Sequence, residues 1–463
     1  MSIKNEFRIL SPTAILGYGY PESSFRRGIS RKPHCIAVDA GSTDPGPYYL
    51  GSGTPFTNRA AVKRDLRLML VHGNKLKIPV VIGTAGGSGA RPHVDWCEKI
   101  IREIAGEEKL SFRLGIVYSD IDKKIVLQAC TQKKLIPLQG VPHASAEIIN
   151  QTTYIAGQIG MEPIINLYKK GCTVILAGRC YDPAVFAALP VHKGFDPGLS
   201  LHCGKILECA AIAATPGSGS DCALGIIKKD SFILETLSPQ RKFTRKSAAA
   251  HTLYEKSDPS HLPGPGGMID LTGTVFTELS GGRVSVHGSR FIPSPQYFVK
   301  IEGARQTGYR TISIAGIRDP IMISQIDTIT SLVKKKVTDN FVREKIKGEI
   351  NFIVYGKNGV MSDRDPVKQT ASHELGVVID AVGDTQDSSA SLCALARSTL
   401  LHWGYPNRIS TAGNLAFPFS PSDAKMGPVF EFSLYHLMPV DDPAAFPYKI
   451  VNIGKAPVYK NVH

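Results

Sequence analysis

Residues 35–53 read Cys35-Ile-Ala-Val-Asp-Ala-Gly-Ser-Thr-Asp-Pro-Gly-Pro-Tyr-Tyr-Leu-Gly-Ser-Gly53, and this stretch decides the expected fold. A short apolar run is followed at once by a loop rich in glycine, serine and proline. Such a run is typical of a strand that is buried on both faces of a parallel sheet. Because open α/β sheets bind ligands at the carboxyl ends of their strands, the loop after Asp39 is the first candidate site.

The first half of the chain continues this alternation of strands and helices. The periodicity of apolar residues predicts helices over 58–77 and 92–104, and strands over 79–83, 112–118 and 172–177. Strands that alternate with helices indicate βαβ units. We therefore expect an α/β domain over residues 1–220, with a mainly parallel, Rossmann-like sheet and glycine-rich loops at the strand ends.

The second half of the chain has a different residue pattern. Residues 268–317 are rich in threonine, valine and isoleucine and contain turn signals, which predicts a meander of antiparallel strands. Helices are expected over 321–342 and 388–403. We therefore expect a second domain of the α+β class over residues 221–463, with antiparallel strands, that closes a cleft with the first.

The composition excludes several classes of protein. Of the 463 residues, 43% are hydrophobic and 20% are charged, as in an ordinary globular protein. No apolar run reaches the roughly 18 residues that span a bilayer, and the first residues do not resemble a secretory signal. We expect a cytoplasmic protein without membrane contact. Neither the cysteine spacing nor the histidine spacing matches a metal site, so no metal and no cofactor is expected.

The net charge of +14 is the unusual number in the composition. The basic residues are dispersed along the chain and match no nucleic-acid-binding motif. We therefore expect no nucleic acid as a partner. A positive field of this kind favours a small anionic substrate.

The loop after Asp39 carries two carboxylates and several hydroxyl groups. Asp39 and Asp44 are candidates for a general base and a general acid, because two carboxyls in different environments can divide these roles. Ser42 and Thr43 are candidate hydrogen-bond donors to a substrate. The alternative is a turn in which the aspartates only bind backbone N–H groups.

Two further strand-end loops have a similar chemistry. Gly86, Gly87, Ser88 and Gly89 precede a predicted helix, whose N-terminus would present N–H groups to an anion. A tight turn without a ligand is the alternative. Arg179 follows the strand at 172–177 and is a candidate bidentate clamp for a carboxylate, or otherwise an internal salt-bridge partner. Asp182 is expected to cap the next helix.

The segment Asp39-Ala-Gly-Ser-Thr43 also resembles the first phosphate loop of actin-like ATPases and sugar kinases. In those folds the strand turns back at once as a hairpin. Here Pro45 and Pro47 disfavour the hairpin, because proline cannot donate a hydrogen bond to a strand ladder.

Longer segments resemble the acyclic terpene utilisation (AtuA-like) family, in the branch with an N-terminal loop like that of residues 39–53. The similar segments are Lys300-Ile-Glu-Gly-Ala304, Gly308–Pro320, Leu401–Arg408 and Thr411-Ala-Gly-Asn-Leu-Ala-Phe-Pro-Phe-Ser-Pro-Ser-Asp423. The resemblance implies catabolism of branched acids or their acyl-CoA thioesters, a lyase step, and a small companion protein. It carries over no catalytic residue.

Asn414 and Ser420 lie in the last of these segments. They are candidates for binding a ligand carboxylate in the cleft, and the alternative is a structural loop that closes the second domain.

Together these patterns lead to one functional hypothesis with two alternatives. We expect a lyase, a hydro-lyase acting on a small branched hydroxy-carboxylate or its acyl-CoA thioester, with Asp39, Asp44 and Arg179 as catalytic residues. One alternative is an ATP-dependent kinase or ATPase of the actin-like type. The other is a non-catalytic subunit that needs the small companion protein. An oligomer of identical chains is also expected.

Overall fold

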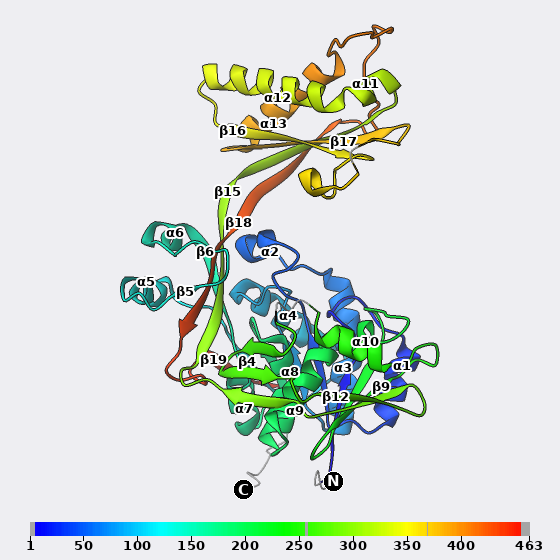
Figure 1. The fold of residues 1–463 in the computed structure, drawn as a ribbon. Coiled ribbons are helices and arrows are strands. Elements are labelled where there is room, and N and C mark those ends of the chain that lie inside the picture. Colours follow the sequence, from blue (N-terminus) through cyan, green and yellow to red (C-terminus); the bar gives the residue numbers. More distant parts are fainter. Residues whose placement is uncertain (1–4, 255–257, 368, 455–463) are drawn as a thin grey trace. The chain divides into compact units, whose positions relative to one another are not determined.

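The computed structural model describes residues 5–254, 258–367 and 369–454 and contains two compact units. Unit 1 comprises Met1–Arg305 and Phe432–His463, and unit 2 comprises Gln306–Glu431. Strands β15 (Phe298–Ile317) and β18 (Asp423–Pro439) are neighbours in one sheet, and each contributes residues to both units (Figure 1). This division differs from the boundary expected at residue 220.

Unit 1 is built on a ten-stranded sheet in the order β12-β13-β9-β8-β1-β2-β3-β7-β4-β19. Its strands are β1 (Phe7–Ser11), β2 (Cys35–Asp39), β3 (Val80–Gly83), β4 (Phe112–Val117), β7 (Val174–Ala177), β8 (Ala223–Ile227), β9 (Phe232–Thr236), β12 (Val275–Leu279), β13 (Arg283–His287) and β19 (Tyr448–Ile453). Strands β1, β2, β3, β7 and β4 pair in parallel, and the others pair antiparallel.

The sheet is therefore mixed rather than mainly parallel as predicted. The reason is that the chain after residue 220 does not begin a new domain. It adds β8 antiparallel to the edge strand β1, with Ile9 opposite Gly225, and then continues through β9, β13 and β12. The change of residue pattern near residue 220 therefore marks a change from parallel to antiparallel strands within one sheet.

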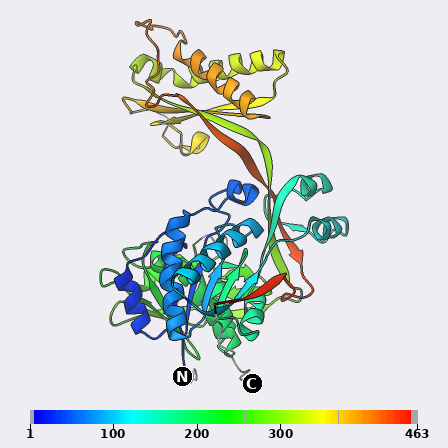
Figure 2. The same cartoon turned by 180° about the vertical axis from the view of Figure 1, so that it is seen from behind.

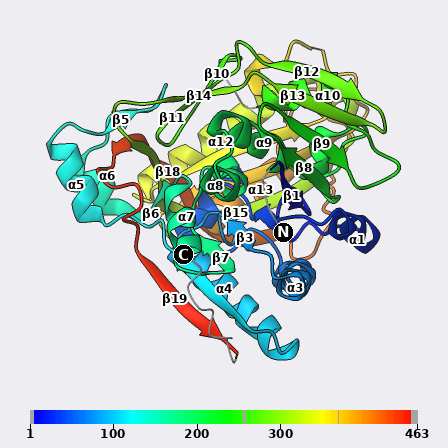
Figure 3. The same ribbon diagram turned by 90° about the horizontal axis from the view of Figure 1, so that it is seen from below.

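Helices cover both faces of this sheet (Figure 3). On one face lie α1 (Glu22–Ser30), α3 (Arg59–Leu76) and α4 (Arg91–Glu107), and on the other lie α7 (Glu162–Lys169), α8 (Asp182–His192) and α9 (Pro197–Leu207). Along β2, Ile36 and Val38 belong to the hydrophobic core under α1, α3 and α4, whereas Ala37 belongs to the core under α7, α8 and α9. Because successive strand residues point to opposite faces, burial on both sides explains the uninterrupted apolar run.

Helices α8 and α9 are almost entirely buried. Every residue from Pro183 to Pro190 is buried, as expected for a helix that is apolar on all sides. The two helices approach closely at Gly204, where a Cβ atom would lie 2.5 Å from the carbonyl oxygen of Pro183. This pair brings the C-terminal end of α9 near the loops at the carboxyl edge of the sheet.

The helix predicted over 58–77 is confirmed as α3, within one residue at each end. Asn58 caps α3, because its side-chain oxygen accepts a hydrogen bond from the N–H of Ala60 at 2.9 Å. The cap predicted at Asp182 is wrong: Tyr181 is the N-cap of α8 and Asp182 is its first helical residue. The Asp182 carboxylate is instead bound to Arg179.

The remaining elements of unit 1 surround this three-layer core. Strand β6 pairs antiparallel with the first part of β15, and a separate three-stranded sheet has the order β10-β11-β14. Their bounds are β5 (Ile136–Pro137), β6 (Thr152–Gln158), β10 (His261–Gly264), β11 (Gly267–Asp270), β14 (Arg290–Pro293), α2 (Pro47–Ser52), α5 (Lys123–Thr131), α6 (Ala146–Gln151), α10 (Arg245–Thr252) and the 3-10 helix Ala210–Ala213.

Unit 2 is an antiparallel sheet with helices on one face (Figure 2). Strands β16 (Gly348–Tyr355) and β17 (Leu375–Gly383) pair with each other, and β17 pairs with the second part of β15. The helices are α11 (Pro320–Ser324), α12 (Ile326–Arg343) and α13 (Gln386–Leu401), with a 3-10 turn at Ser362–Arg364. The single helix predicted over 321–342 is divided at Gln325. The α+β character with antiparallel strands agrees with the sequence prediction.

No helix in the described residues combines the length and the apolar character needed to cross a membrane.

The buried helix α8 provides a test of this architecture. Phe186 has no exposed surface and belongs to the core between α8 and the sheet. We expect Phe186→Ala to lower the free energy of unfolding by about 3–5 kcal/mol, because it leaves a cavity in a packed core. Val342→Ala, at a side chain that is 69% exposed, is the control and should change it by less than about 0.5 kcal/mol. Equal effects of the two variants in urea denaturation would contradict the placement of α8.

Candidate functional site

The loops that follow β2, β3 and β7 meet at the carboxyl edge of the parallel strands. The N–H of Thr84, after β3, donates to the carbonyl of Gly178, after β7, at 3.0 Å. A Cβ atom at Gly41, after β2, would lie 2.8 Å from the Cα of Gly87. The three loops that the sequence singled out are therefore in direct contact in unit 1.

The glycine loop at 86–89 is a tight turn rather than an anion cradle at a helix end. The N–H of Gly87 and the N–H of Gly89 donate to carbonyls within the same turn, at 3.0 and 3.1 Å. Helix α4 begins only at Arg91. These two N–H groups are thus already used, and the expected role of Gly87 and Gly89 in anion binding is not supported. The Ser88 hydroxyl is buried and has no hydrogen-bond partner among the described residues.

Arg179 lies at the centre of the site and is only 3% exposed. Its Nε donates to Oε2 of Glu302 at 2.9 Å, and its Nη1 donates to Oδ1 of Asp182 at 2.7 Å. The same Nη1 lies 3.4 Å from the hydroxyl oxygen of Thr84. Of the two roles considered for Arg179, the structure shows the internal salt-bridge partner, because carboxylates of the protein occupy its guanidinium group.

Asp39 ends β2 and is 5% exposed. Its carboxyl group interacts electrostatically with Arg179 and Asp182, and we call these charged side chains and their partners the cluster. Its Oδ1 atom is buried and accepts no hydrogen bond within the described part of the chain. Burial raises the pKa of Asp39 well above its ordinary value, and the nearby charge of Asp182 raises it further, against the opposing effects of Arg179 and Thr84. The burial of Asp39 therefore favours the protonated form of its carboxyl group in the folded protein.

Asp44 has a different environment from Asp39. It is exposed, and its Oδ2 accepts a hydrogen bond from the Ser42 hydroxyl at 2.7 Å, while its own N–H donates back to Ser42 Oγ at 3.2 Å. Thr43 is buried, and its carbonyl accepts from the N–H of Gly46 at 3.0 Å. These contacts fit the turn that was the alternative for this loop. The carboxylates that raise the pKa of Asp39 are those of Asp182 and Glu208, and Asp44 is not among them.

Two residues of β15 extend the cluster, and the sequence analysis did not propose them. Glu302 is completely buried, and its Oε1 lies 2.7 Å from Nζ of Lys300. Burial would raise the pKa of Glu302, but Arg179 and Lys300 outweigh it and lower the pKa to about 2. Both residues lie in the segment Lys300-Ile-Glu-Gly-Ala304, whose alternation places Lys300 and Glu302 on one face of a strand.

A second buried ion pair lies at the end of α9. Nζ of Lys205 is 2.5 Å from Oε1 of Glu208, and both residues are almost fully buried. The charge of Glu208 contributes to the raised pKa of Asp39, and the charge of Asp182 contributes to the raised pKa of Lys205. This pair therefore belongs electrostatically to the same cluster.

The charges of the cluster balance only when Asp39 is neutral. Three cations, Arg179, Lys205 and Lys300, face three carboxylates, Asp182, Glu208 and Glu302. An ionised Asp39 would add an uncompensated negative charge to a region where charges are costly. This count agrees with the raised pKa of Asp39 and gives it a physical reason.

Asn414 and Ser420 belong to unit 2 and not to this cluster. The Asn414 amide donates to the carbonyl oxygens of Leu400 and Trp403, both at 2.9 Å, and thereby satisfies the end of α13. Ser420 is exposed in the same segment. For Asn414 these contacts fit the structural loop that was the alternative to ligand binding.

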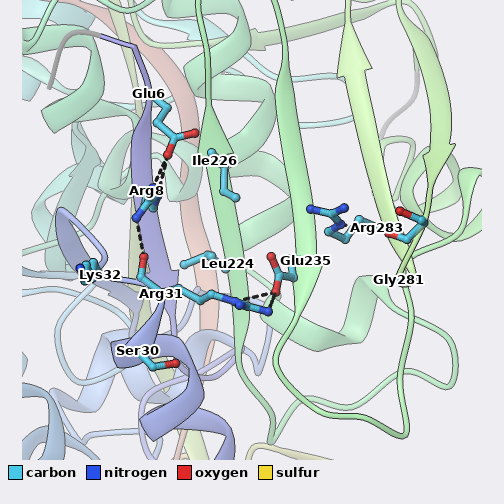
Figure 4. A pocket seen from close by; sticks show the side chains of 11 residues that line it. Glu6, Arg8, Ser30, Arg31, Lys32, Leu224, Ile226, Glu235, Gly281 and Arg283 are labelled. Atoms are coloured by element: carbon cyan, nitrogen blue, oxygen red, sulfur yellow. Dashed lines mark hydrogen bonds and ion pairs between the residues drawn. The ribbon is translucent and has the colours of Figure 1, made fainter.

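A concave region lies on the antiparallel half of the large sheet and has a volume of about 580 Å³ (Figure 4). Two of its four cations are paired with carboxylates: Arg8 pairs with Glu6, and Arg31 pairs with Glu235 at 2.6 Å. Arg283 lies on its other side, from β13 (Figure 4). Because Arg8 is near the amino end of β1, this pocket is not at the edge where Asp39 lies.

No group of three or more histidine, cysteine, aspartate or glutamate side chains that would suit a metal ion occurs in residues 5–254, 258–367 and 369–454. All nine cysteines lie in these residues, and each is a free thiol. Burial raises the pKa of Cys180, next to Arg179, to about 12. A thiol with such a pKa is a poor nucleophile near neutral pH.

Comparison with protein families gives one match. The model of the family described as "Acyclic terpene utilisation family protein AtuA" matches residues 59–223 and 228–407, which is most of the chain. The chain belongs to the AtuA family. Neither curated proteins nor solved structures give a match.

The AtuA match covers Arg179, Lys205 and the Lys300–Glu302 segment, whereas it begins after the loop of residues 39–53. The family description names a pathway and no reaction.

The contact between two of the loops in this AtuA protein is testable at Gly89. This residue has a φ of +69°, and a Cβ atom there would lie 2.1 Å from the backbone nitrogen of Arg179. We expect Gly89→Ala to cost roughly 3 kcal/mol or more of unfolding free energy. Gly106, at the end of α4, has open space around it, so Gly106→Ala should be neutral or stabilising by up to about 1 kcal/mol. A tolerated Gly89→Ala would refute the loop contact.

The proton on Asp39 gives a dependence of stability on pH. A carboxyl with a raised pKa binds its proton more tightly in the folded chain, so its stabilising effect is present below its ordinary value of 3.8 and is lost as pH rises through the folded value. We expect the stability of Asp39→Asn relative to the natural protein to increase from about pH 5 to about pH 8 in urea titrations. A constant difference over this interval would show that Asp39 is ionised in the folded state.

Proposed function

We propose that this protein is a lyase, a hydro-lyase that acts on a small hydroxy-carboxylate, and that Asp39 is its proton donor. The observation that carries the proposal is the buried Oδ1 atom of Asp39, which has no partner in the described residues although a buried polar atom without a hydrogen bond costs about 1–3 kcal/mol. A ligand that accepts a hydrogen bond from this carboxyl would remove that cost.

The chemistry of water elimination matches a protonated carboxyl at this position. A base removes the proton next to the substrate carboxylate, the carbon–oxygen bond breaks, and the hydroxyl leaves as water after taking a proton from an acid. A carboxyl whose pKa is raised by burial serves as such an acid near neutral pH. The sequence offered Asp39 and Asp44 as candidates for the base and the acid, and the raised pKa of Asp39 favours the acid role for it.

Asp182 is our candidate for the base. It follows β7 at the same edge, its side chain is 25% exposed, and it forms an ion pair with Arg179. Arg179 acts through Asp182 and Glu302 as a positioning residue, and the Ser88 hydroxyl is a candidate donor to the substrate. Ser42 and Asp44 hold the loop above β2 through their mutual hydrogen bonds.

The kinase alternative receives less support from the fold. After β2 the chain enters a turn and then helix α2, whose first residue is Pro47, so the antiparallel return strand of actin-like ATPases is not formed by residues 40–52. The position of Asp39 at the carboxyl edge of the parallel strands, where open α/β sheets bind ligands, supports a small-molecule enzyme.

Several expectations from the sequence remain part of the proposal. They are a branched substrate or its acyl-CoA thioester, a cytoplasmic location, a small companion protein and an oligomer of identical chains. The family assignment supports the substrate class only through its description as a terpene utilisation family.

Activity of site variants tests the proposal. Purified protein is incubated with a panel of hydroxy-carboxylates and their CoA thioesters, and the carbon–carbon double bond formed is measured by proton NMR. We expect Asp39→Asn to lower kcat by about a hundredfold or more while remaining folded, because the proton donor is lost. Asp44→Asn is the matched control, an exposed aspartate of the same loop, and should retain nearly full activity.

Three outcomes would contradict the proposal. One is full activity of Asp39→Asn, which removes the acid role. Another is turnover of no member of the panel by the natural protein, either alone or with its companion. The third is thermal stabilisation by Mg-ATP but by none of the acids, which would favour the kinase.

A further inference from the structure

Unit 1 contains a small cavity that the proposed proton transfer does not use. It has a volume of about 180 Å³ and lies between β15, the end of β18 and the turn that joins β10 to β11. Its wall includes Gln158, Pro263, Pro265, Phe298, Lys300 and Leu437. The residues of the three strand-end loops do not line it.

One cation of the buried cluster faces this cavity. The side chain of Lys300 is 21% exposed, and its Nζ lies 2.7 Å from Glu302 Oε1 and 3.1 Å from the Tyr435 hydroxyl. Burial would lower the pKa of Lys300, but Glu302 outweighs it and raises the pKa, so the amine is charged. An ammonium group has three N–H donors. Two partners among the described residues leave one donor for a ligand.

The rest of the wall is largely apolar and is held in place. Phe298 and Leu437 provide side-chain surface, and residues 263–267 provide a turn rich in proline and glycine. A Cβ atom at Gly264 would lie 2.7 Å from the ring of Tyr181, and one at Gly266 would lie 2.8 Å from the ring of Tyr297. The turn is therefore packed against two tyrosines, which gives the cavity a preformed wall.

The size of the cavity limits its occupant. Sites for drug-sized ligands measure about 300–1,000 Å³, so this cavity of about 180 Å³ suits a smaller molecule. A nucleotide carrier such as coenzyme A does not fit inside it. The acyl end of a thioester also lacks the negative charge that would pair with Lys300, whereas a free acid has it.

We infer that this cavity binds a short-chain aliphatic carboxylate as the free acid. The carboxylate accepts a hydrogen bond from Lys300 Nζ, and the carbon chain contacts Phe298 and Leu437. The inference rests on the proposed function in one respect, because a carboxylate is also the chemical class of the proposed substrate. Binding at Lys300 nevertheless requires no turnover, so the two are separable by experiment.

Calorimetric titration of the full chain tests the binding. The probes are acetate, propionate, butyrate and pentanoate at constant ionic strength, with the corresponding neutral amides as matched ligands. We expect the acids to bind and the amides to bind at least about tenfold more weakly, because the hydrogen bond between two charged groups is lost. Amides that bind as tightly as the acids would overturn the inference.

Lys300→Gln tests the cation directly. We expect it to weaken binding of the acids about tenfold or more. The matched control is Lys63→Gln, because the Lys63 side chain is 19% exposed and is also paired with a carboxylate, that of Glu103. Lys63→Gln should bind the acids as the natural protein does. Equal affinity of Lys300→Gln and the natural protein would place the acids elsewhere.

Phe298→Ala provides a test that leaves every charge in place. Removal of the ring enlarges the apolar part of the cavity, so acids with longer chains should gain about fourfold in relative affinity for each added methylene. An unchanged preference for chain length would overturn the assignment of the cavity, even where Lys300→Gln does not fold.

The two proposals fail in different ways. Asp39→Asn is expected to bind the acids with the affinity of the natural protein and to lose turnover. Binding without turnover in the natural protein would reject the lyase and keep the carboxylate site. Turnover without binding of any acid at Lys300 would reject the carboxylate site and keep the lyase.

Discussion

The ion pair between Arg179 and Glu302 is the interaction on which the arrangement of unit 1 depends. It joins the loop after β7 to strand β15, two segments that are 123 residues apart in the chain, at a place where both side chains are buried. Removal of two charges from water costs several kcal/mol for each ion, and their attraction offsets this only when further partners satisfy both groups. Asp182 serves Arg179 and Lys300 serves Glu302 in this way, so one pair requires the rest of the cluster.

This requirement fixes the protonation of Asp39. The carboxylates needed to hold Arg179, Lys205 and Lys300 already equal these cations in number. A further buried negative charge has no counterpart, so the lowest free energy is reached when Asp39 keeps a proton, as the direction of its pKa also indicates. The protein thus maintains a neutral acid beside an arginine, although an isolated pair of this kind would ionise the acid. An unpaired oxygen at this position lowers stability, which is a cost commonly found at functional sites.

The sequence predicted those parts of the structure that depend on neighbouring residues. The buried strand at 35–39, the helix at Arg59–Leu76 and the meeting of three strand-end loops follow from local periodicity and from the geometry of parallel sheets. The partners of Arg179 did not follow, because a lysine and a glutamate two residues apart on a strand usually form an exposed face. Their burial results from the pairing of β6 with β15, which joins distant segments. The antiparallel addition of β8 to β1 was missed for the same reason.

Lys300 and Asp39, at the two ends of the cluster, are coupled by electrostatic interactions and not by a conformational change. Lys300 faces the small cavity, Asp39 lies at the strand ends, and the Glu302–Arg179 pair stands between them. An anion bound at Lys300 adds negative charge to the cluster, and negative charge near a carboxyl raises its pKa further. By thermodynamic linkage, a proton on Asp39 must then favour binding of the anion to the same extent. Given a carboxylate site at Lys300 and an acid at Asp39, an anion bound in the small cavity strengthens the hold of Asp39 on the proton that the elimination of water consumes.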